Sequence, residues 1–457
     1  MLGRLATYVV PAASVTVTAL VLFGPGSPNP APFVRVRGVP VAGGRTLALR
    51  LEGARRLFGV DDVAALEGVT VEVTDAGALL APRAVSLGPD GVGEASVEKT
   101  APLTGPLDVR VLQGKTVLAE GIVPLRAPPP KGAPAGDIAG DIAGVSSGHH
   151  RFFVRARRGH LVSPFPEALD VSVGLPEHVS PYRPSFAGIT LSLSAPGATI
   201  TPEKTDTDER GAASFTVTPL AHHVELAITA RDPDGNEGRW EGLLPVRPGA
   251  IWLDPDLHAG LTFVSPAPRD RVYASIVTDA GRILGAVVPV TRDDVGFFRG
   301  HLDVKPPEEP AQIILSGDPG ERGDATTAWP LGPHAASASA PRLELLLDGS
   351  AAAEAREQAR ASSARRAAVF LVAIAALAEV LLILVRTRAS QRALDANLAA
   401  AVSLEASDEA GAPIPSEDQR RIVESARESH PALRVALVIT LVVLGFALFA
   451  ALSTFRR

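Results

Sequence analysis

The string Val73-Thr-Asp-Ala-Gly77 returns letter for letter at Val277-Thr-Asp-Ala-Gly281. Each copy ends an alternating apolar segment, VTVEVTDAG or VYASIVTDAG, and a second alternating segment follows around a glycine, Gly93 or Gly296. A looser third copy leads from LSLSAPG to TDTDERGAASFTV, around Gly211. Period-two alternation is typical of half-buried strands. A strand–turn–strand unit that recurs three times predicts tandem β-sandwich modules.

The composition of the 457-residue chain also favours many short strands. It contains 42 Gly and 40 Pro, and only 5% of its residues are aromatic. Pro89-Asp-Gly91, Gln113-Gly-Lys115 and Pro233-Asp-Gly-Asn236 are expected to form tight turns. The net charge of -6 excludes a polybasic nucleic-acid-binding protein. Cysteine is absent, which excludes disulfides, thiolate nucleophiles and Cys–zinc sites.

One copy of the repeat carries a resemblance to known domains. With its acidic turn, Gly211, Ala213 and Phe215, TDTDERGAASFTV resembles a strand of bacterial Ig-like and macroglobulin-type β-sandwich domains. The resemblance covers about residues 35–336 and implies tandem Ig-like β-sandwiches. Macroglobulin-type protease traps use a thioester that needs a cysteine. Because this chain has none, the trapping mechanism does not carry over.

Proline- and glycine-rich stretches mark the expected domain boundaries. The clearest is APPPKGAPAGDIAGDIAGVSSG, which ends at Gly148. The expected order is a linker over 24–34, β-sandwich module 1 over 35–126, a Pro/Gly-rich linker over 127–148, module 2 over 149–248, module 3 over 249–331, and a linker with a juxtamembrane helix over 332–366.

Two apolar runs near the C-terminus are long enough to cross a bilayer as helices. Residues 367–385 read AAVFLVAIAALAEVLLILV, and residues 435–452 read VALVITLVVLGFALFAAL. A bilayer core about 30 Å thick takes roughly 20 helical residues, and arginines flank both runs. A weaker run within 1–23 is either a cleaved signal peptide or a retained anchor. Between the two C-terminal spans, 386–434 is expected to form a helical hairpin, and 453–457 a short tail.

The orientation in the membrane rests on the N-terminal run. Eight Lys or Arg residues lie near the spans on each side, so the positive-inside rule does not decide. The N-terminal run and the sandwich-like middle place residues 24–366 outside the cytoplasmic (inner) membrane and 386–434 in the cytoplasm.

Few residues suggest a chemical site. Glu379 is the one charge inside a predicted span, and Arg386 follows seven positions later, on the same helical face. Glu379 pairs with Arg386, faces a helix partner, or takes part in a proton relay. Asp232-Pro-Asp-Gly-Asn-Glu-Gly238 offers oxygens at alternate positions, as a calcium loop would, but it departs from the EF-hand pattern and also suits a hairpin turn.

Two histidine pairs are weaker candidates for a metal. His222 and His223 are expected on a strand, where neighbours point to opposite faces, and His149 and His150 border a predicted linker. The sequence contains no phosphate-binding loop, no nucleophile elbow and no HExxH motif.

These patterns favour a protein that is not an enzyme and that uses no cofactor or nucleic acid. The first hypothesis is a membrane-anchored envelope protein whose Ig-like modules form a binding or scaffold surface for protein partners. The alternative is an accessory subunit of a signalling or transport complex. In that case the C-terminal hairpin would couple binding outside to a cytoplasmic partner, and a membrane enzyme ranks third.

Overall fold

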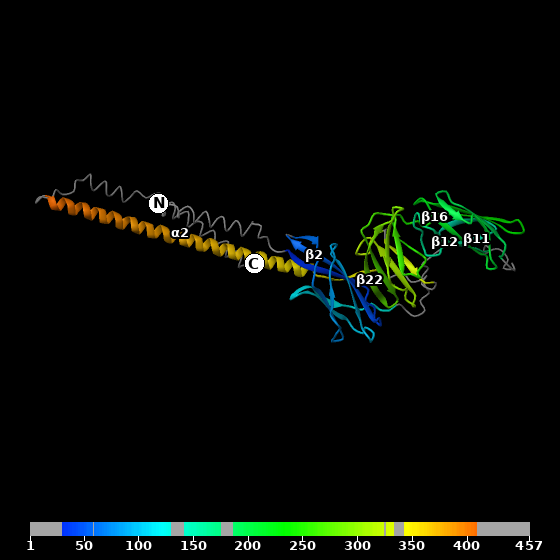
Figure 1. Ribbon diagram of the computed structural model, residues 1–457, viewed down its shortest axis with the longest axis horizontal. Coiled ribbons are helices and arrows are strands. Elements are labelled where there is room, and N and C mark those ends of the chain that lie inside the picture. The colour runs from blue at the N-terminus through cyan, green and yellow to red at the C-terminus, as the bar shows by residue number, and fades with distance from the viewer. Residues whose placement is uncertain are drawn as a thin grey trace. The chain divides into compact units, whose positions relative to one another are not determined.

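The computed structural model describes residues 30–57, 59–128, 141–174, 186–323, 326–332 and 342–408. Every described strand lies between Ala31 and Asp348, and helix α2 (Ser350–Asp408) follows them in the chain (Figure 1). Residues 32–353 form one compact unit. The described chain is mainly β before α2 begins, which confirms the predicted fold class of its central region.

The first sandwich packs two sheets around one apolar core. One sheet has the order β27-β1-β2-β3 with β7 paired to β2, and the other has the order β5-β4-β8-β9 with β6 paired to β4. Leu49 of β2 and Val71 of β4 meet in the core. The strands are β1 (Ala31–Gly38), β2 (Thr46–Leu57), β3 (Val60–Val63), β4 (Val69–Asp75), β5 (Ala78–Leu79), β6 (Arg83–Val85), β7 (Val92–Glu98), β8 (Leu107–Gln113), β9 (Thr116–Val123) and β27 (Glu344–Asp348).

The second sandwich repeats this plan. Its sheets have the orders β11-β12-β16-β14 and β10-β18-β17-β13-β15. Val171, Phe215 and Ile228 pack in the core between them. The strands are β10 (Gly144–Gly148), β11 (Arg151–Ala156), β12 (Glu167–Gly174), β13 (Thr190–Ser194), β14 (Ala198–Thr201), β15 (Lys204–Asp206), β16 (Ala212–Pro219), β17 (Glu225–Arg231) and β18 (Glu237–Leu243).

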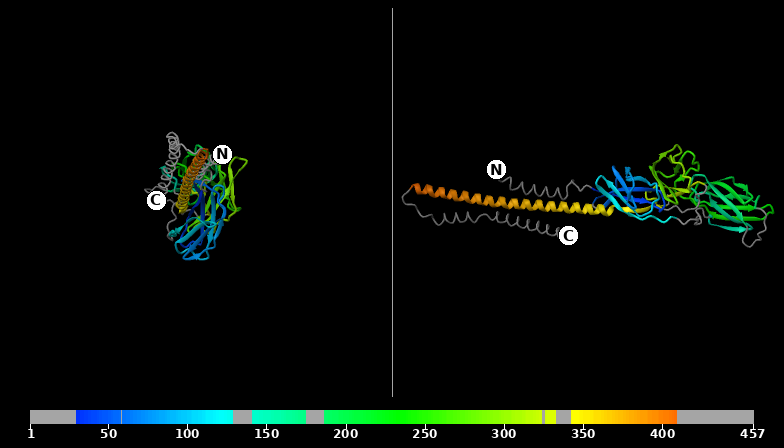
Figure 2. Two further views of the ribbon diagram at one scale, coloured as in Figure 1. Left: turned by 90° about the vertical axis from the view of Figure 1, so that its left-hand side faces the viewer. Right: turned by 90° about the horizontal axis from the view of Figure 1, so that it is seen from below.

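The third sandwich has sheets of order β19-β20-β24-β23 and β22-β21-β25-β26. Phe263 and Trp329 are fully buried in its core. The strands are β19 (Trp252–Leu253), β20 (Leu261–Ser265), β21 (Arg271–Thr278), β22 (Gly281–Pro289), β23 (Thr291–Arg292), β24 (Phe298–Leu302), β25 (Ala311–Ser316) and β26 (Thr327–Leu331). Figure 2 shows the strands from two further directions.

The sequence repeat corresponds to the same place in all three sandwiches. Its first strand is β4, β13 or β21, and its second is β7, β16 or β24. In each case the two strands lie in opposite sheets, and the first strand pairs with the following β8, β17 or β25. This division of strands between two antiparallel sheets is that of an Ig-like sandwich.

The acidic turn of the repeat has a structural role. The carboxylate of Asp208 accepts hydrogen bonds from the backbone N–H groups of Arg210 (2.9 Å) and Ala212 (2.8 Å). Asp293 does the same for the N–H groups two and four residues later. The turn then needs a left-handed residue, which Gly211 supplies with φ of 76°. In the first copy that glycine is Gly91 and not the predicted Gly93.

The last strand of the β region returns to its first strand. β27 pairs antiparallel with β1, with Arg35 opposite Asp348 and Gly38 opposite Glu344. The N–H of Gly349 donates to the carbonyl of Val34 at 3.1 Å. No Cβ fits at Gly349, because it would lie 1.9 Å from the carbonyl oxygen of Leu118 in β9. The β region therefore begins and ends at the same place on the first sandwich.

The structure differs from the predicted linkers at three points. Residues 31–34 belong to β1, 144–148 form β10, and 344–348 form β27. β10 pairs with β18 and β27 pairs with β1, both far away in the sequence. Composition marks where a chain can turn, but it does not show a strand whose partner is distant.

Helix α2 covers several predicted segments. It includes the juxtamembrane stretch, the apolar run 367–385 and the start of the predicted hairpin. Many side chains of 367–385 are not among those described. Among the described residues, no helical stretch combines the length and apolar character that crossing a bilayer demands. The runs 1–23 and 435–452 lie outside the described residues.

Candidate functional site

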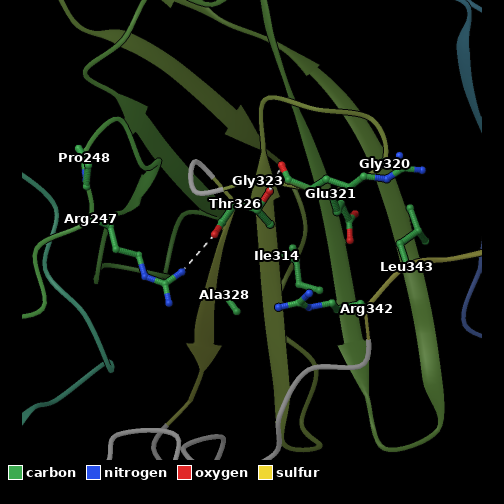
Figure 3. A pocket seen from close by; sticks show the side chains of 11 residues that line it. Arg247, Pro248, Ile314, Gly320, Glu321, Gly323, Thr326, Ala328, Arg342 and Leu343 are labelled. Atoms are coloured by element: carbon green, nitrogen blue, oxygen red, sulfur yellow. Dashed lines mark hydrogen bonds between the residues drawn. The ribbon is translucent and has the colours of Figure 1, made fainter.

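A groove of about 850 Å³ opens along the third sandwich (Figure 3). Three parts of the chain line it. The first is the β25–β26 region with its connecting turn, the second is Arg247 with Pro248, and the third is Arg342 with Leu343 just before β27. The groove is thus built where the second sandwich leads into the third and where the chain turns back to the first.

The turn after β25 is fixed by its own hydrogen bonds. The carboxylate of Asp318 accepts from the N–H of Arg322 at 3.0 Å, and its carbonyl accepts from the N–H of Glu321 at 3.0 Å. Ser316 Oγ and Thr326 Oγ1 lie 2.8 Å apart across the base of the turn. Glu321 takes a left-handed conformation with φ of 53°, which costs energy for a residue with a side chain.

That conformation turns Glu321 into the protein. Although Glu321 lines the groove, only 8% of it is exposed. Its Oε1 accepts from Arg50 Nη1 at 3.0 Å and from the hydroxyl of Ser275. Arg50 lies on β2 of the first sandwich, so the charge of Glu321 is balanced by another module.

Three arginines leave the groove positively charged. Arg247, Arg322 and Arg342 are all exposed. Arg247 donates to the carbonyl of Thr326 at 3.3 Å. Among the described residues, no carboxylate forms an ion pair with any of these three guanidiniums. A guanidinium has a fork of donors that matches a carboxylate or a phosphate.

Beneath the groove, a buried charge network joins the first and third sandwiches. Arg50 and Arg282 have fully buried side chains, and both donate to Glu94 Oε1, at 2.6 and 2.8 Å. Burial lowers the pKa of Arg50, but the carboxylates of Glu94 and Glu321 outweigh it, so the net shift is upward. Gly285 leaves room for the network, since a Cβ there would lie 2.0 Å from Arg282 Nη2 and would displace the guanidinium. The network thus holds two fully buried guanidiniums beside the carboxylates of Glu94 and Glu321.

The acidic turn in the first copy of the repeat also contacts the third sandwich. Asp90 Oδ1 forms an ion pair with Arg271 Nη1 at 2.8 Å, and its Oδ2 accepts from the hydroxyl of Tyr273 at 2.8 Å. Burial, followed by the contact with Asp90, raises the pKa of Tyr273. The turn therefore has a second role in this copy, because it fixes the third sandwich to the first.

An aromatic cluster joins the second and third sandwiches. The Arg158 guanidinium lies 4.5 Å from the ring centre of Trp329 and donates to the carbonyl of Leu253 at 2.8 Å. Glu167 pairs with Arg158 at 2.5 Å. His160 contacts Trp329 with ring centres 4.2 Å apart. Burial, then the charges of Arg247 and Arg158, lower the pKa of His160 to about 3, so its imidazole is neutral at neutral pH.

The loop considered for calcium is a hairpin turn between β17 and β18. Both oxygens of Asp232 accept hydrogen bonds from Asn236, at 2.8 Å from its N–H and 2.9 Å from its side-chain amide. Gly235 supplies the left-handed residue, with φ of 87°. Among the described residues, no group of three or more His, Asp or Glu could hold a metal ion. The geometry favours the hairpin interpretation.

The histidine pairs are not brought together. The strand predicted to carry His222 and His223 begins only at Glu225, so these two residues lie in an exposed bend, because β16 ends before them at Pro219. His223 Nε2 lies 3.6 Å from Glu225 Oε1. His150 is buried in the second sandwich instead of bordering a linker, with Nε2 4.0 Å from Asp232 Oδ2.

Glu379 and Arg386 both lie on α2, seven residues apart. Their side chains are outside the described set. The intramembrane pair stays a prediction.

Sequence reasoning missed the residues that matter most at this site. Arg50 occupies an outward position of β2, between the inward Leu49 and Leu51, and such a position usually faces water. It is buried because β22 of the third sandwich lies against β2. Nothing local in the sequence signals that contact. The three arginines of the groove are likewise far apart in the sequence.

Comparisons with known proteins assign no family to the chain. No known family model and no curated protein matches the chain. Among solved structures, the Yersinia pseudotuberculosis adhesin InvE is 13% identical over 47% of this chain and 58% of its own, with a TM-score of 0.16. The Escherichia coli adhesin FdeC is 15% identical over 69% and 96%, with a TM-score of 0.16.

Escherichia coli alpha-2-macroglobulin is 9% identical over 69% of this chain and 23% of its own, with a TM-score of 0.18. Identities and TM-scores this low carry no argument about fold or function. The chain spans only 58% of the length of the Yersinia pseudotuberculosis adhesin structure. The expected tandem β-sandwich modules are seen in the strand orders of this chain itself.

Proposed function

We propose that this chain is a non-enzymatic, membrane-anchored protein of the cell envelope. Its β-sandwich modules, over 35–126, 149–248 and 249–331, would provide a binding or scaffold surface outside the cytoplasm. The observation that carries the proposal is the pairing of β1 with β27, followed directly by α2. A region whose two ends lie side by side suits attachment at one place, with its loops and groove free for partners.

The anchor itself rests on the sequence. The apolar run 367–385 lies within α2, 435–452 follows, and the run within 1–23 precedes β1. The proposed partners are the lipid bilayer of the cytoplasmic membrane and other proteins of the envelope. The proposal includes no cofactor and no nucleic acid.

The scaffold part of the proposal is supported by the buried contacts between sandwiches. A flexible string of modules needs few contacts between neighbours, whereas here Arg50, Glu94, Arg282 and Glu321 are shared between two modules. Removing one partner of such a network leaves an uncompensated buried charge. A surface composed of several modules then keeps its geometry, which is what a scaffold requires.

The absence of cysteine allows a sharp test of topology. Single variants Ser147→Cys in β10 and Gln391→Cys in α2 each place one thiol at an exposed position. With a membrane-impermeant maleimide on intact spheroplasts, Ser147→Cys should react at once. Gln391→Cys should react only after the membrane is permeabilised. Equal labelling of the two variants before permeabilisation would contradict the proposed topology.

A second candidate function is coupling across the membrane. The first turn of α2 is held by the first sandwich, because Arg56 Nη1 donates to the carbonyl of Ser350 at 3.4 Å and Ala353 is fully buried. Only Gly349 separates β27 from α2. A change in the first sandwich would therefore act directly on the start of the helix.

The predicted hairpin decides between anchor and coupling element. Residues 390–430 can be replaced by a Gly/Ser linker of equal length. Loss of cytoplasmic partners with normal insertion would support coupling. Retention of the same partners would leave the segment as a connector.

A further inference from the structure

The groove on the third sandwich has a charge that the described protein does not balance. Arg247, Arg322 and Arg342 line it. Among the described lining residues Glu321 is the one carboxylate, and it already pairs with Arg50. The described lining of the groove therefore presents three exposed positive charges and one neutralised negative charge. Positive groups gathered in a concave surface focus the electrostatic field and attract an anionic ligand.

Apolar side chains lie among these charges. Ile314, Ala328 and Leu343 line the groove, and in Figure 3 the guanidiniums of Arg247 and Arg342 lie on either side of Ala328. A groove of about 850 Å³ is much larger than a single ion needs and is within the range of sites that hold a sizeable organic ligand. Its occupant should therefore carry both acidic and apolar groups.

We propose that this groove binds an acidic segment of a partner protein in an extended conformation. Carboxylates of the segment pair with Arg247 and Arg342, and an apolar side chain between them covers Ala328 and Ile314. An extended chain places alternate side chains on opposite faces. Acidic residues of the segment can therefore contact the two arginines while the apolar residues between them contact Ala328 and Ile314. Arginine clusters are a recurring means of recognising acidic motifs. The inference deepens the proposed binding role and rests on it.

The test uses the full-length chain and a short fluorescent peptide of alternating Glu and Leu, with a Gln/Leu peptide of the same length as its counterpart. Fluorescence anisotropy should show saturable binding of the Glu peptide, weaker at higher salt, and at least about tenfold weaker binding of the Gln peptide. Arg247→Ala and Arg342→Ala should each weaken binding by about tenfold or more. Arg292→Ala removes an exposed arginine elsewhere on the same sandwich and should leave binding unchanged.

Several results would overturn the inference. These are equal binding of both peptides, affinity unchanged in Arg247→Ala and Arg342→Ala, or the same loss in Arg292→Ala. Phosphatidylglycerol vesicles form a separate arm with the same variants. If they bind through Arg247 and Arg342 while the Glu peptide does not bind, the ligand is a lipid surface and the peptide proposal is wrong. Tryptophan fluorescence confirms that each variant is folded.

The outcome is separable from the proposed function. Maleimide labelling of Ser147→Cys and Gln391→Cys tests membrane topology without reference to the groove. Normal labelling with no peptide binding overturns the inference alone. Reversed labelling with intact peptide binding overturns the topology alone.

Discussion

Truncation of Arg50 tests whether the first and third sandwiches stabilise each other. Arg50 has no exposed side-chain area, and it donates five hydrogen bonds, to Glu94, Glu321, Ser275 and the carbonyls of Pro319 and Ala274. Arg50→Ala removes all of them and leaves Glu321 buried without its cation. Breaking a buried pair on one side costs about 3–5 kcal/mol.

Urea unfolding of the full-length chain, followed by tryptophan fluorescence, measures this effect. All three tryptophans, Trp240, Trp252 and Trp329, lie in the second and third sandwiches, whereas Arg50 lies in the first. A shift of the fluorescence transition therefore reports coupling between modules. With a slope of about 2 kcal/mol per M, a loss of about 4 kcal/mol lowers the midpoint by about 2 M.

The matched control is Arg110→Ala. Arg110 pairs with Glu120 at 3.6 Å on the surface of the first sandwich, where both side chains are about half exposed. Such surface pairs contribute about 0–1 kcal/mol. If Arg50→Ala shifts the midpoint no more than Arg110→Ala does, the buried network does not hold the two sandwiches together and the reasoning fails.

Three further predictions use other parts of the structure. Because the pKa of His160 is lowered from 6.5 to about 3, the unfolded chain binds more protons than the folded chain in that interval. The free energy of unfolding should therefore fall below about pH 6.5, by up to about 1.4 kcal/mol per pH unit. His160→Gln should flatten this part of the pH profile in urea unfolding, and an unchanged profile would count against it. Gly349→Ala would bring a Cβ to 1.9 Å from the carbonyl of Leu118, so it should cost about 1–3 kcal/mol and speed hydrogen exchange in β27. Gly105→Ala, whose Cβ would meet only Asp75 at 3.8 Å, is the control and should change little. Asp208→Ala removes the acceptor for two backbone N–H groups and should lower the stability of the second sandwich by about 1 kcal/mol or more in thermal unfolding. The exposed Asp234→Ala should not, and equal losses would refute the role of the turn.

The strands that sequence reasoning found share one property. VTVEVTD at 69–75 alternates cleanly, lies next to turn residues, and forms β4 as predicted. The hairpin at Pro233-Asp-Gly-Asn236 also formed where turn chemistry indicated it. In these cases the information is local, because the pattern of one face and the neighbouring turn suffice.

The features that escaped prediction depend on contacts between distant residues. β27 was expected within a linker and helix, and only its pairing with β1 makes it a strand. Arg50 shows the same limit for a single side chain, since its burial depends on a face that the third sandwich covers. The arginines of the groove come together from positions 247, 322 and 342. Charge and periodicity along the chain do not reveal such assemblies.

The pairing of β27 with β1 has a consequence for the engineering and the evolution of the chain. Val34 and Gly349 are hydrogen-bonded neighbours, although more than three hundred residues separate them. Such a region can be treated as a cassette. Residues 31–349 could be cut out as a block, or grafted between two adjacent surface positions of a different host, without stretching the host backbone. Because β1 and β27 hold the two ends together, the modules between these strands could be exchanged or duplicated without changing the distance between the ends.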